Sequence, residues 1–132
     1  MDSTEARARF AAARVARLAT ADAAGVPHLV PVTFAVAGDE IVFAVDHKPK
    51  STLALKRLAN IAANPAVSFL VDHYDDDWDR LWWVRADGEA TVTDRTEPVD
   101  WLRAKYPQYR EHPPQGPVVI TRITVWRDWS ST

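Results

Sequence analysis

Hydrophobic and polar positions along this chain alternate with a period near two over most of its length, as they do in β-strands. The first residues differ, because Ala6, Phe10 and Ala13 recur at i, i+4 and i+7. Asp2 and Glu5 precede them with capping-box spacing. We therefore expect a short helix at the start of the chain.

Strands are predicted at residues 15–21, 27–36, 41–45, 66–72, 81–94 and 118–129. The segment 41–45 is a short apolar, β-branched run without alternation, which suits a strand covered on both faces. Pro27 and Pro31 cannot donate to a ladder, so the second strand should have an edge or a bulge. Asp87 and Gly88 indicate either a bulge in the fifth strand or a hairpin turn at that point.

Two further helices interrupt the strands. One carries an apolar stripe of Leu55, Leu58, Ala59 and Ala62 and is ended by Asn64-Pro65. The other is expected after a Thr96 cap and includes Val99, Trp101 and Leu102. A proline-rich loop should then span residues 107–117.

About six strands in hairpin order favour a mainly β fold, and a closed barrel fits them better than a sandwich or a parallel sheet. The length of 132 residues predicts one domain, 1–132. The net charge of −2 argues against a nucleic-acid partner. The chain lacks cysteine and any apolar run of roughly 18 residues, so a cytoplasmic protein without a membrane span is expected.

A basic segment offers the clearest candidate binding site. Lysine and arginine surround two hydroxyl side chains at the expected start of the middle helix: Lys48, Lys50, Ser51, Thr52, Lys56 and Arg57. Free N–H groups and the positive end of the helix dipole favour a phosphate or carboxylate there. The alternative is an ordinary amphipathic helix with solvated lysines, which spacing alone favours.

Aromatic and acidic residues gather in a second segment. Asp75, Asp77 and Asp79 match the first ligand positions of a calcium loop, but Arg80 and Ala86 replace its glycine and glutamate, so no metal site is expected. Neighbouring Trp82 and Trp83 should point to opposite faces of a strand. Trp78 lies in a polar loop, where packing alone explains a tryptophan poorly.

The order of these segments resembles the pyridoxamine-phosphate-oxidase-like split β-barrel superfamily. The resemblance is carried by Gly-x-Pro at 25–27, the basic loop 46–50, Asn64-Pro65, the block 71–78 and the block 81–88. It covers nearly the whole chain, and within the superfamily the chain looks like the actinobacterial subgroup that uses coenzyme F420.

This resemblance implies a six-stranded, FMN-binding-like split barrel that forms a homodimer with cofactor sites at the interface. The strand around Pro31, Val32 and Thr33 would approach the flat ring of the cofactor. The basic loop and helix would take its phosphate and acidic tail, and Trp78 of the second subunit would cover the ring. The proline-rich stretch from Pro107 has no clear counterpart in the family.

The resemblance and the charge pattern together favour an F420-dependent oxidoreductase that transfers a hydride between the deazaflavin and an unsaturated or quinone-like small molecule. F420 is preferred over FMN because its polyglutamate tail adds negative charge. An FMN-binding flavoprotein and a non-catalytic F420 carrier are the alternatives. No acid or base side chain stands out as catalytic, so the protein would bind and orient the cofactor and exclude solvent.

Overall fold

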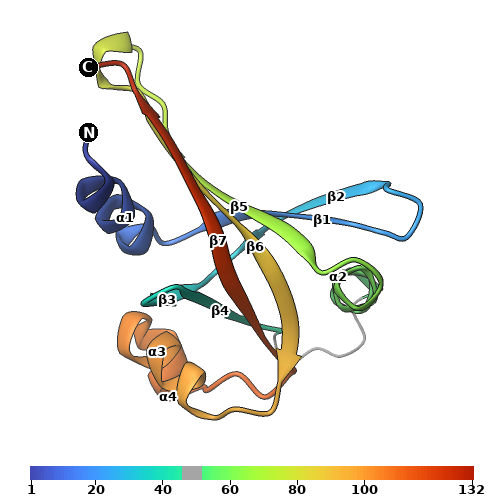
Figure 1. Ribbon diagram of the computed structural model, residues 1–132. Coiled ribbons are helices and arrows are strands. Elements are labelled where there is room, and N and C mark those ends of the chain that lie inside the picture. The colour runs from blue at the N-terminus through green and yellow to red at the C-terminus, as the bar shows by residue number, and fades with distance from the viewer. Residues whose placement is uncertain (46–51) are drawn as a thin grey trace.

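The computed structural model describes residues 1–45 and 52–132, with side chains in the middle helix described from Lys56 onward. Figure 1 shows a strongly curled sheet with helices at its ends. The helices are α1 (Ser3–Ala12), α2 (Thr52–Ala63), α3 (Glu97–Lys105) and α4 (Pro107–Glu111), with a 3-10 turn η1 (Trp78–Arg80). The strands are β1 (Ala16–Ala21), β2 (Pro27–Val32), β3 (Ala35–Ala37), β4 (Glu40–Ala44), β5 (Ala66–His73), β6 (Trp82–Thr93) and β7 (Val118–Ser130).

All described strands form one antiparallel sheet in the order β2-β1-β5-β6-β7-β4-β3. The two edge strands, β2 and β3, are separated in sequence only by Thr33 and Phe34. The three steps from Val32 to Ala35 can span only about 11 Å, so these ends of the two edge strands must lie near each other. The sheet is therefore curled into a barrel that is split between β2 and β3, which confirms the predicted class.

The described strands number seven, where about six were expected, because the strand predicted over residues 27–36 is broken at Thr33 and Phe34. Phe34 is fully buried, and its ring lies 5.1 Å from that of Phe10 on α1. The break lets the chain cross from one edge of the sheet to the other while Phe34 fills the core beneath the split.

Helix α1 begins as the capping spacing predicted. The Asp2 carboxylate accepts a hydrogen bond from the Glu5 backbone N–H at 2.8 Å. Ala6 and Phe10 are buried, and the Phe10 ring also meets the Trp126 ring edge-on at 5.1 Å. Burial of this one face holds α1 against the barrel.

The long strands β6 and β7 carry the predicted bulge, with a register shift between Asp87 and Gly88. The hairpin alternative is wrong, because β6 continues through both residues. A Cβ atom at Gly88 would overlap the carbonyl oxygen of Arg122 and approach the Thr121 methyl group to 2.8 Å. Glycine is therefore required where the bulged strand crosses β7 closely.

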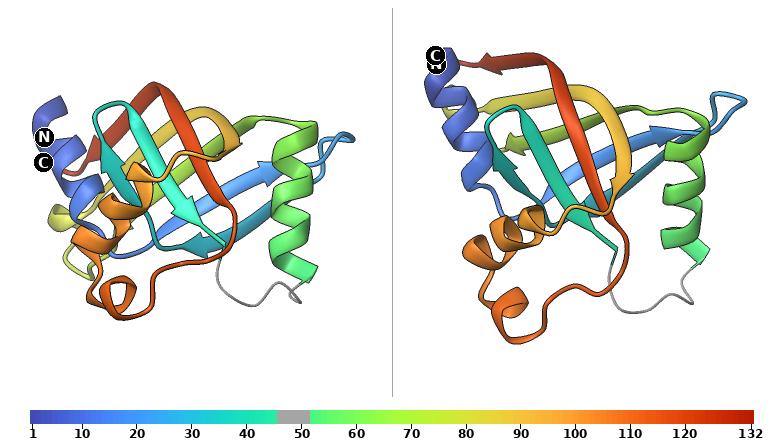
Figure 2. Two further views of the ribbon diagram at one scale, coloured as in Figure 1. Left: turned by 90° about the horizontal axis from the view of Figure 1, so that it is seen from below. Right: turned by 60° about the horizontal axis from the view of Figure 1, so that its bottom comes forward.

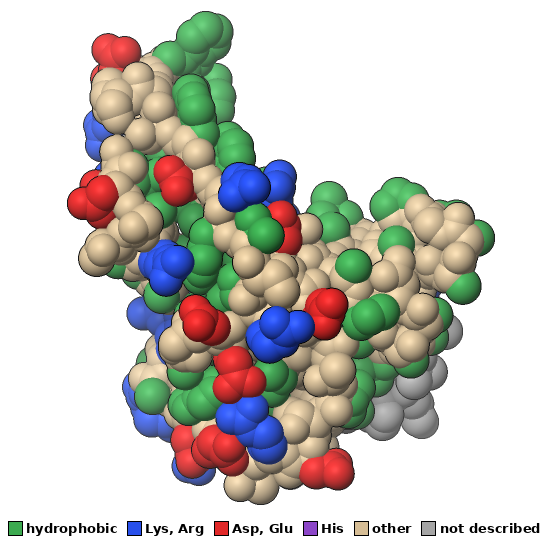
Figure 3. All heavy atoms as spheres, viewed as in Figure 1, with side chains coloured by type: hydrophobic (Ala, Val, Ile, Leu, Met, Phe, Trp, Pro, Cys, Tyr) green, Lys and Arg blue, Asp and Glu red, His purple; other side chains and the backbone are tan. Residues whose placement is uncertain are grey.

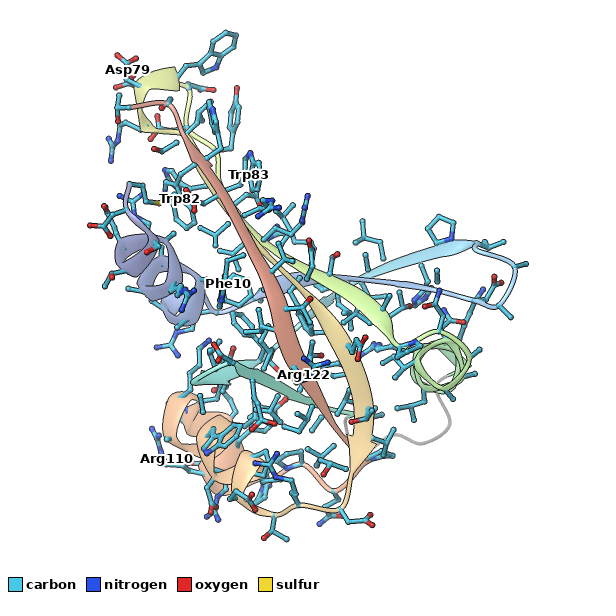
Figure 4. The ribbon with its side chains drawn as sticks, in the orientation of Figure 1. Phe10, Asp79, Trp82, Trp83, Arg110 and Arg122 are labelled. Carbon is cyan, nitrogen blue, oxygen red and sulfur yellow. The ribbon has the colours of Figure 1, made fainter. Side chains whose placement is uncertain are left out.

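The ends of β5, β6 and β7 project from the barrel together with η1, and we call this projection the arm (Figure 1). Trp82 and Trp83 point to opposite faces of β6, as expected (Figure 4). The Arg9 guanidinium of α1 lies 5.2 Å from the Trp82 ring centre. Trp83 is directly opposite Trp129 on the other face.

The later helices differ from the predictions in their buried faces, their caps and their number. In α2, Ala59 and Ala62 of the expected apolar stripe are exposed, whereas Asn60 and Ile61 are buried. Thr96 precedes α3 but makes no side-chain capping bond. The segment 107–117, expected to be loop, begins with α4.

Candidate functional site

Strand β2 forms one edge of the sheet and is paired only with β1. Half of the peptide groups of an edge strand face away from its partner and are free to bind a ligand. Pro27 and Pro31 are exposed there, and neither has an N–H to donate. These prolines reduce the number of free donors, which protects the edge from pairing with another strand.

Helix α2 is attached to the barrel at one end of β2. The buried Asn60 side chain donates a hydrogen bond to the Thr20 hydroxyl on β1 at 3.2 Å. Thr20 is paired with His28 on β2. Arg57 lies three residues before Asn60, on the same side of α2, and we call the region of Arg57, Asn60, Thr20 and His28 the α2 junction.

Arg57 is the embedded cation of the α2 junction. Its side chain is half-buried, and its guanidinium carbon lies 5.8 Å from the ring centre of Phe43 in the core. The Arg57 Nε atom is buried and finds no hydrogen-bond partner among the described residues. Burial lowers the pKa of Arg57. An anion bound beside this nitrogen would supply the missing acceptor and stabilise the charge.

A second side-chain nitrogen in the α2 junction is also buried and unpartnered. His28 is half-buried on β2, and its Nδ1 atom is buried without a hydrogen-bond partner in the described part of the chain. Buried polar atoms without a hydrogen-bond partner are uncommon in folded proteins, so both nitrogens call for an explanation. The α2 junction therefore fits the anionic end of a cofactor better than a fully packed core would.

At its other end, β2 runs toward the part of the barrel where α3 and α4 pack (Figure 2). A pocket lies there between the start of α4 and the segment that links α1 to β1. The pocket has a volume of about 600 Å³ and is lined by Arg14, Val15, Thr33, Tyr106, Pro107, Gln108 and Tyr109. The Thr33 and Tyr109 hydroxyl oxygens lie 2.7 Å apart. Five steps along the strand from His28 to Thr33 span about 17 Å, so β2 connects the α2 junction to this pocket.

The three residues predicted to approach the cofactor ring differ in their exposure. Pro31 is exposed on the outer face of β2, Val32 turns its side chain into the core, and Thr33 is half-buried at the pocket. Val32 can therefore offer a ligand only its backbone. Pro31 and Val32 end the β2 edge strand, and Thr33 follows them at the split of the barrel.

The basic segment is described only in part. Arg57 is embedded in the α2 junction, whereas Lys56 is exposed. Thr52 is the first residue of α2. Lys48, Lys50 and Ser51 lie outside the described residues.

Trp78 is far from both ends of β2 within one chain. It lies in η1 at the tip of the arm, at the opposite end of the molecule from α2 (Figure 1). Its side chain is 69% exposed, and its Nε1–H donates to the Tyr74 hydroxyl at 3.4 Å. A single chain therefore does not bring Trp78 to the other predicted site residues.

The carboxylates of the acidic loop beside Trp78 accept hydrogen bonds from backbone N–H groups of the same loop. Asp75 accepts a hydrogen bond from the Asp77 N–H, and Asp77 accepts one from the Asp79 N–H. Among the described residues, no three histidine, aspartate or glutamate side chains converge as metal ligands would.

Sequence reasoning missed His28, Tyr109 and Lys105. His28 carried no motif, and its burial depends on how α2 packs. Tyr109 and Lys105 fell in segments with no recognised pattern, although Tyr106 and Tyr109 at i and i+3 could have suggested a helical turn. The Lys105 Nζ is buried 3.8 Å from the Phe34 ring centre, and burial followed by the nearby Arg14 charge lowers its pKa to about 8.

The curled sheet, split at a free edge strand and covered by short helices, defines a split-barrel fold. Residues 3–129 match the family model described as pyridoxamine 5'-phosphate oxidase. The chain belongs to this family. No curated protein matches it at a significant level.

Solved structures share the fold. A conserved hypothetical protein from Mycobacterium tuberculosis has a TM-score of 0.77 and 24% identity, over 99% of this chain and 86% of that one. An FAD-binding protein from Mesorhizobium loti has a TM-score of 0.70 and 20% identity, over 97% and 94%. A heme storage protein from Vibrio cholerae has a TM-score of 0.72 and 14% identity, over 97% and 93%. At these identities the likeness concerns the fold alone.

None of the helices in the described part of the chain combines the length and apolar character needed to cross a membrane.

Proposed function

We propose that this protein is a homodimeric, cytoplasmic oxidoreductase that uses coenzyme F420 and acts on an unsaturated or quinone-like small molecule. One observation carries the proposal. Arg57 holds a half-buried guanidinium whose Nε lacks an acceptor among the described residues, on the helix that Asn60 joins to β1, the strand next to the free edge strand β2. A flat ring along β2 and an anionic tail at the α2 junction match these two features.

The anionic tail is assigned to the α2 junction and the start of α2. Arg57 supplies a charge that burial has already stripped of part of its water. Thr52 begins the helix, whose first N–H groups have no partners within the helix. Lys48, Lys50, Ser51 and Lys56 add cations and a hydroxyl in sequence next to these groups. Several cations suit a polyglutamate tail better than a single phosphate.

The ring is assigned to the backbone of β2 at Pro31, Val32 and Thr33. The fold relation to an FAD-binding protein from Mesorhizobium loti supports a flavin-type ring at this kind of barrel. The bound deazaflavin would supply or accept the hydride, and the acceptor would take a proton from water as it is reduced. The chain itself would bind and orient the ring and exclude solvent.

The homodimer is proposed because Trp78 is separated from β2 within one chain. The arm exposes a group of aromatic side chains, Tyr74, Trp78 and Trp129, and hydrophobic side chains follow its edge in Figure 3. A second copy related by a two-fold axis would cover this arm and bring its own Trp78 to the first copy's site. A catalytic or binding role for Trp78 requires this second copy.

The outer face of the sheet suits such an interface. It combines exposed apolar residues with internally paired charges. The Arg85 guanidinium and the Asp87 carboxylate make a two-bonded ion pair, with Nε at 2.9 Å from Oδ1. Arg17 lies 3.5 Å from Asp72, and Leu29 is 67% exposed on β2. Charges already neutralised within one chain lower the cost of burying this face against a second copy.

A side-by-side fluorescence titration with F420 and FMN tests the proposal. We expect saturable binding of F420 that is tighter than binding of FMN, followed by hydride transfer to a quinone or enone acceptor when reduced F420 is supplied. A purified protein that is yellow and binds FMN more tightly than F420 would show that the cofactor is FMN and would contradict the proposed use of F420. Tight F420 binding with no turnover of any acceptor would identify a carrier.

A further inference from the structure

We infer that the pocket at the start of α4 binds a flat, largely apolar molecule that carries a carboxylate, and that this molecule is the hydride acceptor. The shape and charge of the ligand are inferred from the residues that line the pocket. Its assignment to the acceptor rests on the proposed function, because Thr33 belongs both to the pocket and to the strand assigned to the ring.

The pocket has the size and lining of a small-molecule site. Its volume of about 600 Å³ falls in the range of ligand pockets. Val15, Pro107 and the two tyrosine rings form apolar walls. The Tyr106 and Tyr109 rings meet edge-on with their centres 5.6 Å apart, which provides a corner against which a flat molecule can pack.

Two hydroxyls in the pocket can serve a ligand oxygen. Thr33 and Tyr109 share one hydrogen bond at 2.7 Å, which uses one hydrogen atom of the pair. The second hydrogen atom of the pair is then available for a ligand. Tyr106 is different, because its hydroxyl accepts from the Phe34 N–H and donates to the Arg14 carbonyl. The Thr33–Tyr109 pair, and not Tyr106, can therefore donate a hydrogen bond to a ligand.

The charges around the pocket favour a ligand that carries a carboxylate. Arg14 lines the pocket and spends one of its five N–H donors on the Lys105 carbonyl at 2.9 Å. Lys105 does not line the pocket, and its buried Nζ faces the Phe34 ring instead. None of the described residues that line the pocket is acidic. A carboxylate in the pocket would therefore find the Arg14 cation and no opposing charge.

The test titrates the isotopically labelled, cofactor-free protein with 1-naphthoate and with the neutral 1-naphthamide, and follows backbone amide signals by NMR. We expect saturable shifts at Thr33, Tyr106 and Gln108, with the carboxylate bound about tenfold more tightly than the amide, as one charge-assisted bond provides. Arg14→Gln should remove this difference between the two probes. Tyr109→Phe should weaken both probes several-fold.

The matched control is Arg103→Ala, which removes an exposed arginine on α3 away from the pocket lining and should leave both affinities unchanged. Equal affinity for the two probes, or shifts confined to other parts of the protein, would overturn the inference. An F420 titration of the same protein separates the two proposals. Naphthoate binding without F420 binding would retain the pocket and reject the proposed cofactor.

Discussion

The Tyr106 hydroxyl accepts a hydrogen bond from the backbone N–H of Phe34 at 3.1 Å, in a buried position. The same hydroxyl donates to the Arg14 carbonyl at 2.8 Å. One side chain at the end of α3 thus ties the split between β2 and β3 to the segment that connects α1 with β1. The segment that follows α3 forms the pocket, so this bond links the barrel to the proposed acceptor site.

Replacing Tyr106 by phenylalanine should destabilise the protein by about 1–3 kcal/mol, because it leaves the buried Phe34 N–H without an acceptor. Urea unfolding followed by tryptophan fluorescence measures this change. Tyr109→Phe is the control, since the Tyr109–Thr33 bond is only part-buried and its loss should cost less. Equal losses of stability in the two variants would contradict the assigned role of Tyr106.

The buried Lys105 should make stability depend on pH. Its folded-state pKa of about 8 lies below the ordinary value of 10.5, because burial and Arg14 disfavour the charge. Between these two values the unfolded chain binds more protons than the folded chain, so Lys105 lets stability rise with pH. As pH rises from about 7 to 10, the free energy of unfolding of the wild type should therefore increase relative to that of Lys105→Met.

Urea unfolding of both proteins across this range measures the effect. Burial raises the pKa of Tyr106, which adds stability present below the unfolded pKa of tyrosine and lost as pH rises further. Since both proteins contain Tyr106, its contribution cancels in the comparison. A difference that stays constant with pH would show that Lys105 titrates normally.

Replacing Trp78 by alanine should weaken F420 binding and leave the dimer intact. The exposed indole makes one long hydrogen bond, to Tyr74, so its removal costs the folded chain little. Light scattering coupled to size-exclusion chromatography reports the dimer, and fluorescence titration reports the affinity. A variant that becomes monomeric would assign Trp78 to subunit packing, and an unchanged affinity would remove it from the site.

Much of the fold could be predicted from the sequence because alternation is a local signal. The helix after Asp2 followed from neighbouring residues alone, and at Asp87-Gly88 they left two alternatives, a bulge and a hairpin turn, of which the pairing with β7 shows the bulge. The break at Thr33 did not, because Phe34 leaves the strand to fill a core built from distant segments. The buried face of α2 was misjudged for a related reason, since Asn60 is buried only through its bond to Thr20 on another strand.

The candidate site was less accessible to sequence reasoning. Arg57 was found because it lies in a basic segment, but its buried Nε depends on packing against Phe43. His28 and Tyr109 contribute through contacts with residues far away in sequence. Such contacts leave no local pattern in the sequence, so the sites at the two ends of β2 could be recognised only in the folded structure.

The affinity of the Arg57→Ala variant for F420 tests the central claim most directly. The wild-type protein should bind F420, and loss of one charge-assisted contact should weaken binding by about 1.5–3 kcal/mol. The double replacement of Lys50 and Arg57 should cost about 2–4 kcal/mol, whereas Arg103→Ala, which removes an arginine from α3, should change nothing. Equal affinities of wild type and Arg57→Ala in the same fluorescence titration would contradict the assignment of the cofactor tail to the α2 junction.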